Sequence, residues 1–153
     1  MKELVPMEST VIAIDPGREK CGVAVVRSPN RVLLKEVVST PELTSFVQRL
    51  ISEFKTTQMV LGDRTSSQAA QKRLNALLVN GKDPDIALVD EHKSTEAARK
   101  RYWEENPPAG LRRLIPTSMQ VPPGPVDDYV AVILAERYFS AQGKIKSCDF
   151  SKT

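Results

Sequence analysis

The stretch VIAIDPGREKCGVAVV, residues 11–26, decides the fold of this chain. Its two apolar runs have the length of β-strands and flank a short polar link, a pattern that predicts a β-hairpin. Asp15 ends the first run; Pro16 restricts it to extended backbone angles, and Gly17 permits the positive φ that a tight turn can need. Asp15 therefore either begins a turn and does nothing more, or projects from the edge of a sheet on a stiff strand. The hairpin by itself does not decide between the two.

The composition is that of an ordinary soluble globular domain. The chain has 153 residues, of which 41% are hydrophobic and 27% charged, enough for one domain with a real core. No apolar run approaches the roughly 18 residues of a membrane span, and residues 1–10 lack a signal-peptide core, so we expect a cytoplasmic protein that does not bind membranes. Cys21 and Cys148 form neither a disulfide framework nor a metal site, which indicates a reducing compartment. The net charge of +3 permits a polyanionic partner without establishing one.

The rest of the chain alternates apolar strands with helices. We expect, in order, a strand at 31–38, a helix at 43–54 introduced by a hydroxyl cap, a proline and an acid at 39–42, a buried strand at 58–62, a helix from Ser66 or Ser67 to Asn80-Gly81, a buried strand at 86–89, a helix from Ser94 or Thr95, and a last helix at 126–142. Strands that alternate with helices in this way predict an α/β fold with a mixed sheet.

Prolines mark a long loop before the last helix. Residues 106–125 contain six of the eleven prolines, with a helical turn expected near residues 111–114. A loop of this length inside a compact domain is usually functional or mobile. We interpret 1–153 as a single domain with a core at about 10–142 and a frayed tail at 143–153.

Acidic residues stand at the ends of predicted strands and at the start of the last helix. They are Asp15, Asp63, Asp90, Glu91, Asp127 and Asp128. Asp15, Asp63, Asp90 and Glu91 each follow a predicted strand. If these strands are parallel, the four acids share the edge of the sheet where ligands bind in α/β folds. Crowded carboxylates repel one another unless a cation neutralises them, and Mg²⁺ or Mn²⁺ prefers oxygen ligands. Taken singly, the acids after the last strand also fit a solvated turn, and the pair on the helix fits dipole stabilisation. Periodicity does not choose which of that pair faces inward.

Three segments, in this order, resemble the signature motifs of the YqgF family. They are Ile14-Asp15-Pro16-Gly17 with Gly22-Val23-Ala24-Val25, Val89-Asp90-Glu91 with Ser94-Thr95-Glu96-Ala97-Ala98-Arg99, and Val126-Asp127 with Ala131-Val132-Ile133-Leu134 and Tyr138-Phe139. The family comprises nucleases similar to Holliday junction resolvases, related to the RuvC type and of the ribonuclease H-like fold. The resemblance spans about residues 10–142 and implies a mixed five-stranded sheet flanked by helices.

The resemblance also implies a site and an activity. Carried over residue by residue, Asp15, Glu91 and Asp127 form a catalytic acidic site that binds Mg²⁺ or Mn²⁺, and Asp127 rather than Asp128 faces Asp15. Asp63 follows the strand near which RuvC-type resolvases hold an essential acid, so we expect it near the cluster as a further metal ligand. The implied activity is that of a metal-dependent endonuclease acting on structured nucleic acid, either branched DNA or a ribosomal RNA precursor. The oligomeric state is left open.

The chain departs from the family's pattern in three places. Gly62-Asp63-Arg64 stands where Gly-Leu-Pro is usual, Asp90-Glu91-His92 stands where Asp-Glu-Arg is usual, and the proline-rich loop is longer. These departures support an alternative, a resolvase-like module that binds nucleic acid or protein with weak or no cleavage. A further alternative rests on Asp15-Pro16-Gly17, which resembles the first phosphate loop of actin-like and sugar-kinase ATPases. Those proteins need two such domains, and this chain provides one.

Basic residues around the second half of the proposed site fit a phosphate backbone. The expected nucleic-acid-binding residues are Lys93, Arg99, Lys100, Arg101, Arg112 and Arg113. The run at 99–101 fits a solvated helix face equally well. Tyr102 and Trp103 could stack on a base, although packing in the core is the commoner role of such residues.

Overall fold

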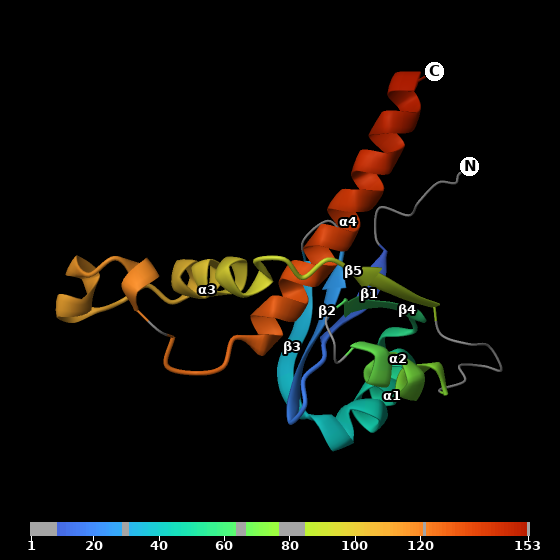
Figure 1. Ribbon diagram of the computed structural model, residues 1–153, viewed down its shortest axis with the longest axis horizontal. Coiled ribbons are helices and arrows are strands. Elements are labelled where there is room, and N and C mark those ends of the chain that lie inside the picture. Colours follow the sequence, from blue (N-terminus) through green and yellow to red (C-terminus); the bar gives the residue numbers. More distant parts are fainter. Residues whose placement is uncertain (1–8, 29–30, 64–66, 77–84, 121, 153) are drawn as a thin grey trace.

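A computed structural model describes residues 9–28, 31–63, 67–76, 85–120 and 122–152. Its centre is a five-stranded sheet with the strand order β3-β2-β1-β4-β5 (Figure 1). The strands are β1 (Thr10–Asp15), β2 (Lys20–Arg27), β3 (Arg31–Ser39), β4 (Gln58–Gly62) and β5 (Asp85–Val89). The predicted mixed sheet is confirmed, because β1, β2 and β3 pair antiparallel whereas β1, β4 and β5 pair parallel.

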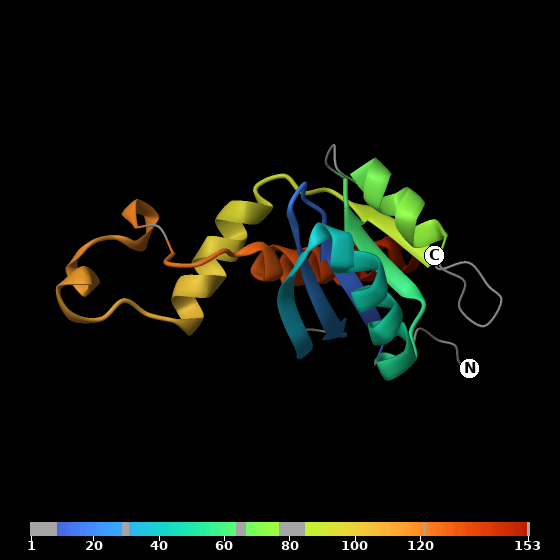
Figure 2. The ribbon, with the colours of Figure 1, turned by 90° about the horizontal axis from the view of Figure 1, so that it is seen from below.

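Helices cover both faces of this sheet. The helices α1 (Leu43–Phe54) and α2 (Ser67–Asn75) lie on one face, and α4 (Asp127–Lys152) crosses the other and packs against α3 (Ser94–Glu105) (Figures 1 and 2). Three short 3-10 helices, η1 (Thr40–Glu42), η2 (Gly110–Leu114) and η3 (Thr117–Met119), join the longer elements. The expected turn near residues 111–114 is therefore confirmed as η2. The predicted helix end at Asn80-Gly81 lies outside the described residues.

Successive side chains of β1 enter two different cores. Ile12 and Ile14 pack with α1 and α2, whereas Val11 and Ala13 pack with α4. This alternation follows from the two-residue period of a strand. All four side chains are fully buried. The strand is thus held from both faces, which fixes the position of its last residue, Asp15.

The start of α1 differs from the sequence expectation in one detail. Pro41 and Glu42 occupy the first turn as predicted, but Ser39 forms no side-chain capping bond. Its hydroxyl instead donates a hydrogen bond of 2.7 Å to the carboxylate of Glu42. The acid three residues along the chain has taken the hydroxyl that was expected to cap the backbone.

The prediction that the strand at 86–89 is buried is wrong. β5 is the last strand in the sheet order, and the side chain of Leu88 is 52% exposed. The run Ile86-Ala87-Leu88-Val89 is apolar enough for a strand, but an apolar run does not show whether the strand is central or at an edge.

The C-terminal helix is longer than expected. A helix end at Gln142 and a frayed tail were predicted, whereas α4 continues to Lys152. Gly143 lowers helix stability by only about 1 kcal/mol, and no proline follows it to end the helix. In the part of the chain that the structure describes, no helix combines the length and apolar character needed to cross a membrane.

The proline-rich loop extends away from the sheet together with α3 (Figures 1 and 2). We call residues 106–125 the arm. Its large apolar side chains are exposed, with exposed fractions of 84% for Leu111, 83% for Leu114 and 76% for Met119. The arm begins after α3, which follows Glu91, and ends at α4, which begins with Asp127.

Candidate active site

Asp15 is the last residue of the central strand β1. It therefore lies in the middle of the sheet edge formed by the carboxyl ends of the parallel strands. It ends β1, between β2 and β4, and it follows Val11 and Ala13 at the strand period, so it faces the α4 side. Its register partner on β2 is Gly22. On β4, Ile14 is level with Leu61, which places Gly62 beside Asp15. Asp15 is therefore flanked by a glycine on each side.

Each of these glycines makes room for one of the other two predicted acids. A Cβ atom at Gly22 would lie 1.8 Å from the backbone oxygen of Asp127. A Cβ atom at Gly62 would lie 2.2 Å from Cδ of Glu91 and 2.4 Å from its Oε2. Glycine in a strand often marks such a close approach. The backbone at the start of α4 and the carboxyl group of Glu91 thus flank Asp15 over the two neighbouring strands.

The two aspartates at the start of α4 turn in different directions. Asp127 lies 4.0 Å from Nζ of Lys20, at the beginning of β2. Asp128 lies 3.6 Å from Nζ of Lys35, on β3. Because β3 is separated from β1 by β2, Asp128 is directed away from Asp15. This supports the prediction that Asp127 is the acid on the Asp15 side.

Lys35 also contacts Tyr129, whose ring centroid lies 4.2 Å from its Nζ atom. Partial burial lowers the pKa of Lys35, but Tyr129 and Asp128 outweigh this effect and leave the pKa above its usual value. Lys35 therefore stays charged and holds Asp128 over β3.

Asp63 lies beside Glu91. Its backbone N–H donates to the oxygen of Val89 at 3.1 Å, and its Oδ1 accepts a hydrogen bond of 3.2 Å from the backbone N–H of Glu91. The side chain of Glu91 is 2% exposed, whereas Asp63 is exposed. The structure thus shows Asp63 positioning the turn that carries Glu91. Its expected role as a metal ligand stays a prediction.

The oxygen donors of these acids suit a hard divalent cation such as Mg²⁺ or Mn²⁺. Their placement does not yet complete a site: among the described residues, no group of three or more Asp, Glu, His or Cys side chains could hold a metal ion. The expectation that Asp15, Glu91 and Asp127 converge on one cation is therefore not met by the side-chain positions. The backbone nevertheless brings all three to the same edge on the same face of the sheet.

The predicted nucleic-acid-binding residues fall into two groups. Lys93, Arg99 and Lys100 are exposed, as are Arg112 and Arg113 on the arm. Arg101 differs, because its guanidinium binds Glu136 of α4 and lies 3.2 Å from Glu105. Burial lowers the pKa of Arg101, but the two carboxylates outweigh it and raise the pKa above its usual value. Arg101 thus joins α3 to α4, and it is not an available cation on a solvated face.

The aromatic residues of α3 pack rather than standing free. Tyr102 makes edge-to-face contacts with Trp103 and with Tyr129 of α4, at centroid distances of 5.1 and 5.7 Å. Tyr102 thus packs against the core that includes α4, as expected for such residues. Trp103 is half-buried and belongs to neither core, so its role stays a prediction.

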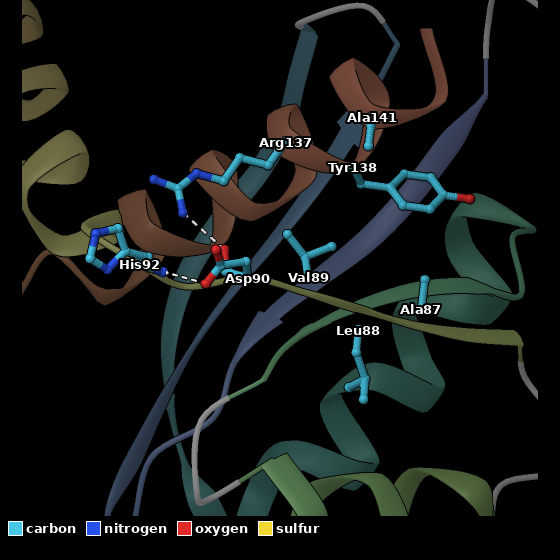
Figure 3. A pocket seen from close by; sticks show the side chains of 8 residues that line it. All are labelled: Ala87, Leu88, Val89, Asp90, His92, Arg137, Tyr138 and Ala141. Carbon is cyan, nitrogen blue, oxygen red and sulfur yellow. Dashed lines mark hydrogen bonds between the residues drawn. The ribbon is translucent and has the colours of Figure 1, made fainter. Parts of the chain in front are cut away.

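A groove of about 650 Å³ lies between β5, the turn at Asp90 and His92, and α4 (Figure 3). Ala87 and Val89 point toward α4, whereas Leu88 points the other way. Arg137 donates a 2.9 Å hydrogen bond to the backbone oxygen of Asp90, and the His92 backbone N–H donates one of 2.9 Å to the Asp90 carboxylate. His92, the single histidine of the chain, therefore sits in a turn that is tied to α4.

Sequence reasoning missed the residues that support the acids. Lys20 pairs with Asp127 and Lys35 pairs with Asp128, so the two aspartates are directed to different strands. The local sequence pattern does not indicate these pairings. The signal for Gly22 and Gly62 was available, since each interrupts or ends an apolar strand beside a candidate acid.

The fold is similar to that of two solved structures. A structure of T. thermophilus RuvC in complex with a Holliday junction substrate matches with a TM-score of 0.58 and 18% identity, over 88% of this chain and 96% of that chain. A further structure of Thermus thermophilus RuvC matches with a TM-score of 0.58 and 16% identity, over 89% and 97%. No family model matches the chain, and no curated protein matches it. The chain therefore has the ribonuclease H-like fold of RuvC, a mixed five-stranded sheet flanked by helices.

Proposed function

We propose that this protein is a divalent-metal-dependent endonuclease of the YqgF type that acts on structured nucleic acid. One observation carries the proposal: Asp15 lies between Gly22 and Gly62, and these glycines admit Asp127 and Glu91 to its two sides. The likeness to a resolvase whose structure holds a Holliday junction supports branched DNA as a substrate. The motif resemblance supports a ribosomal RNA precursor as the other candidate.

In this proposal Asp15, Glu91 and Asp127 hold Mg²⁺ or Mn²⁺, with Asp63 as a further candidate ligand. A bound divalent ion supplies the charge that activates water and stabilises the leaving oxygen in phosphodiester cleavage. Asp15 is the rigid member, since its strand is buried on both faces. Lys20, whose Nζ lies 4.0 Å from the Asp127 carboxylate, would compete with such an ion for Asp127.

The exposed cations give the substrate a path to this edge. Lys93 precedes α3, Arg99 and Lys100 lie on it, and Arg112 and Arg113 continue the positive charge onto the arm. Such residues bind the phosphate backbone regardless of sequence, so binding should weaken steeply with salt. This fits a protein that recognises the shape of a nucleic acid rather than its bases.

A second candidate is a binding module with weak or no cleavage. The observation that favours it is the arrangement of the carboxylates, which in the described residues does not complete a metal site. Here Lys20 takes the place of a cation permanently, and the acids serve to stabilise the fold.

Cleavage of a four-way DNA junction and of a ribosomal RNA precursor, in Mg²⁺ and in Mn²⁺, tests the proposal. Asp127→Asn should lower the cleavage rate by about 100-fold or more, because a ligand of the reacting centre is lost. Asp128→Asn is the matched control: it changes the neighbouring carboxylate, which is directed to Lys35, and should leave the rate within about threefold of wild type.

Asp15→Asn should abolish cleavage while the unfolding transition in urea is retained. Nucleic-acid binding without cleavage by the wild-type protein, in both metals, would establish the binding module instead. Equal losses for Asp127→Asn and Asp128→Asn would contradict the assignment of Asp127.

A further inference from the structure

A second cavity opens at the same edge of the sheet, on the opposite face. It has a volume of about 160 Å³ and is lined by Pro16, Gly17 and Arg18 after β1, by the floor of Cys21, Thr40 and Leu43, and by Ala69, Ala70 and Arg73 of α2. Asp15 faces α4, whereas this cavity lies on the side of α1 and α2. Nothing in the predicted acidic site uses it.

The lining of this cavity suits an anion. Both of its charged residues, Arg18 and Arg73, are cationic and exposed. Neither guanidinium forms an ion pair with any residue that the structure describes. Among the described residues that line the cavity there is no carboxylate. Two arginines that line one small cavity, neither paired with a described carboxylate, are suited to bind phosphate oxygens.

The floor of the cavity is held in place by hydrogen bonds. The Thr40 hydroxyl donates to the backbone oxygen of Gly17 at 2.9 Å, and Sγ of Cys21 lies 3.5 Å from the same hydroxyl oxygen. These bonds tie the hairpin turn to η1. The turn that carries Arg18 is therefore fixed relative to the start of α1.

We propose that this cavity binds a phosphate group of the nucleic acid that neighbours the phosphate cleaved at Asp15. The inference rests on the proposed nuclease function and adds a binding subsite to it. Gly17 is two residues from Asp15, so their Cα atoms are at most about 7.6 Å apart. A strand that crosses the edge of the sheet between the two faces contacts both positions. Arg18 and Arg73 then fix the register of the strand over the acids.

Salt dependence of binding tests this subsite. The full-length protein is titrated with a four-way DNA junction in EDTA, which prevents cleavage, at salt concentrations from about 50 to 200 mM. Arg73→Gln should reduce the slope of log affinity against log salt by about one unit, because one phosphate contact is lost. Lys72→Gln is the matched control, since Lys72 is the exposed neighbour of Arg73 on α2 and does not line the cavity. It should leave the slope unchanged.

A second variant tests whether weaker junction binding comes from the cavity itself. Ala69 lines the cavity but is exposed, so Ala69→Glu adds a negative charge there without disturbing the core. It should weaken junction binding more than Arg73→Gln does, while the urea midpoint stays that of wild type. The amide resonance of Gly17 should shift on titration of inorganic phosphate into the wild-type protein, and the shift should be lost in Arg73→Gln.

The outcomes separate the two proposals. If the wild-type protein binds the junction and Arg73→Gln has the same salt slope as Lys72→Gln, the subsite is wrong and the nuclease proposal stands. If inorganic phosphate shifts the Gly17 amide resonance but Arg73→Gln leaves junction binding unchanged, the cavity is a site for free phosphate. This outcome also overturns the subsite. If the wild-type protein binds no junction and no ribosomal RNA precursor, both proposals fail.

Discussion

The centre of the sheet edge and the arm represent two opposite ways of presenting functional side chains. At the centre, Asp15 ends a strand that is buried on both faces, and the neighbouring acids are admitted by two glycines. On the arm, Arg112 and Arg113 lie between leucines whose exposed fractions exceed 80%. The tightly packed residues therefore surround Asp15, where the positions of the acids matter for catalysis. The arm instead contributes exposed charge and apolar surface.

Among the substitutions at the site and on the arm, Gly22→Ala should cause the largest loss of stability. Gly22→Ala places a methyl group 1.8 Å from the backbone oxygen of Asp127. Because this contact is with backbone, the start of α4 must move, and we expect a loss of about 3 kcal/mol in the free energy of unfolding. Urea denaturation measures the loss.

Gly124 provides the control on the arm. An added Cβ there meets nothing within 4 Å, so Gly124→Ala should change the unfolding free energy by less than about 0.5 kcal/mol. Similar losses at Gly22 and Gly124 would erase the contrast between the two regions.

A smaller effect is expected at Gly62, where the added methyl group meets a side chain rather than backbone. Gly62→Ala should cost about 1–2 kcal/mol, because Glu91 is buried and cannot swing freely away. In a Glu91→Ala background the obstructing carboxyl group is gone, and the cost should fall below about 0.5 kcal/mol. A double-mutant cycle in urea measures this coupling. Additive losses would mean that Glu91 does not lie over Gly62.

The sequence predicts the centre well because its pattern is local. The alternation in residues 11–14 and 23–26 determines which side chains enter each core, and the register of β1 with β2 follows from a short hairpin. The alternation of strands with helices predicted a mixed sheet, and β1, β4 and β5 are the strands that pair parallel in it. With these strands parallel, Asp15, Asp63, Asp90 and Glu91 follow strands that end at one edge of the sheet, as the sequence analysis expected on that condition.

Properties that depend on distant partners were beyond the sequence. The exposure of Leu88 follows from the place of β5 at the end of the sheet, which its apolar neighbours do not encode. The pairing of Lys35 with Asp128 joins residues 93 positions apart, and Arg101 reaches Glu136 across two helices. A side chain engaged in such an ion pair is less available to contact a substrate, so these pairs could not be inferred from local sequence but affect the site.

Substitutions at Asp63 test whether its hydrogen bond to the Glu91 backbone N–H stabilises the site. Asp63→Ala removes the acceptor for the Glu91 backbone N–H and should lower the unfolding free energy by about 1 kcal/mol. Asp63→Asn retains a side-chain oxygen at the same place, so it should restore most of that stability. Calorimetric titration with Mn²⁺ then separates the two roles, because Asp63→Asn should weaken binding less than Asp15→Asn if Asp63 mainly orients Glu91. Equal losses of Mn²⁺ affinity would make Asp63 a primary ligand, and an unfolding free energy unchanged in Asp63→Ala would remove the positioning role.

The smallest effect on stability belongs to the arm. Leu111→Ser and Leu114→Ser together should change the unfolding free energy by no more than about 0.5 kcal/mol, because both side chains already face solvent. Leu50→Ala, in the core under the sheet, is the comparison and should cost about 2–5 kcal/mol. A loss above about 1 kcal/mol in the arm variant would show that the leucines pack against the body in solution. With stability unchanged, any fall in the affinity of the arm variant for a DNA junction reports contacts with the nucleic acid itself. The arm variant thus measures binding without the structural cost that accompanies every change at Gly22 or Gly62.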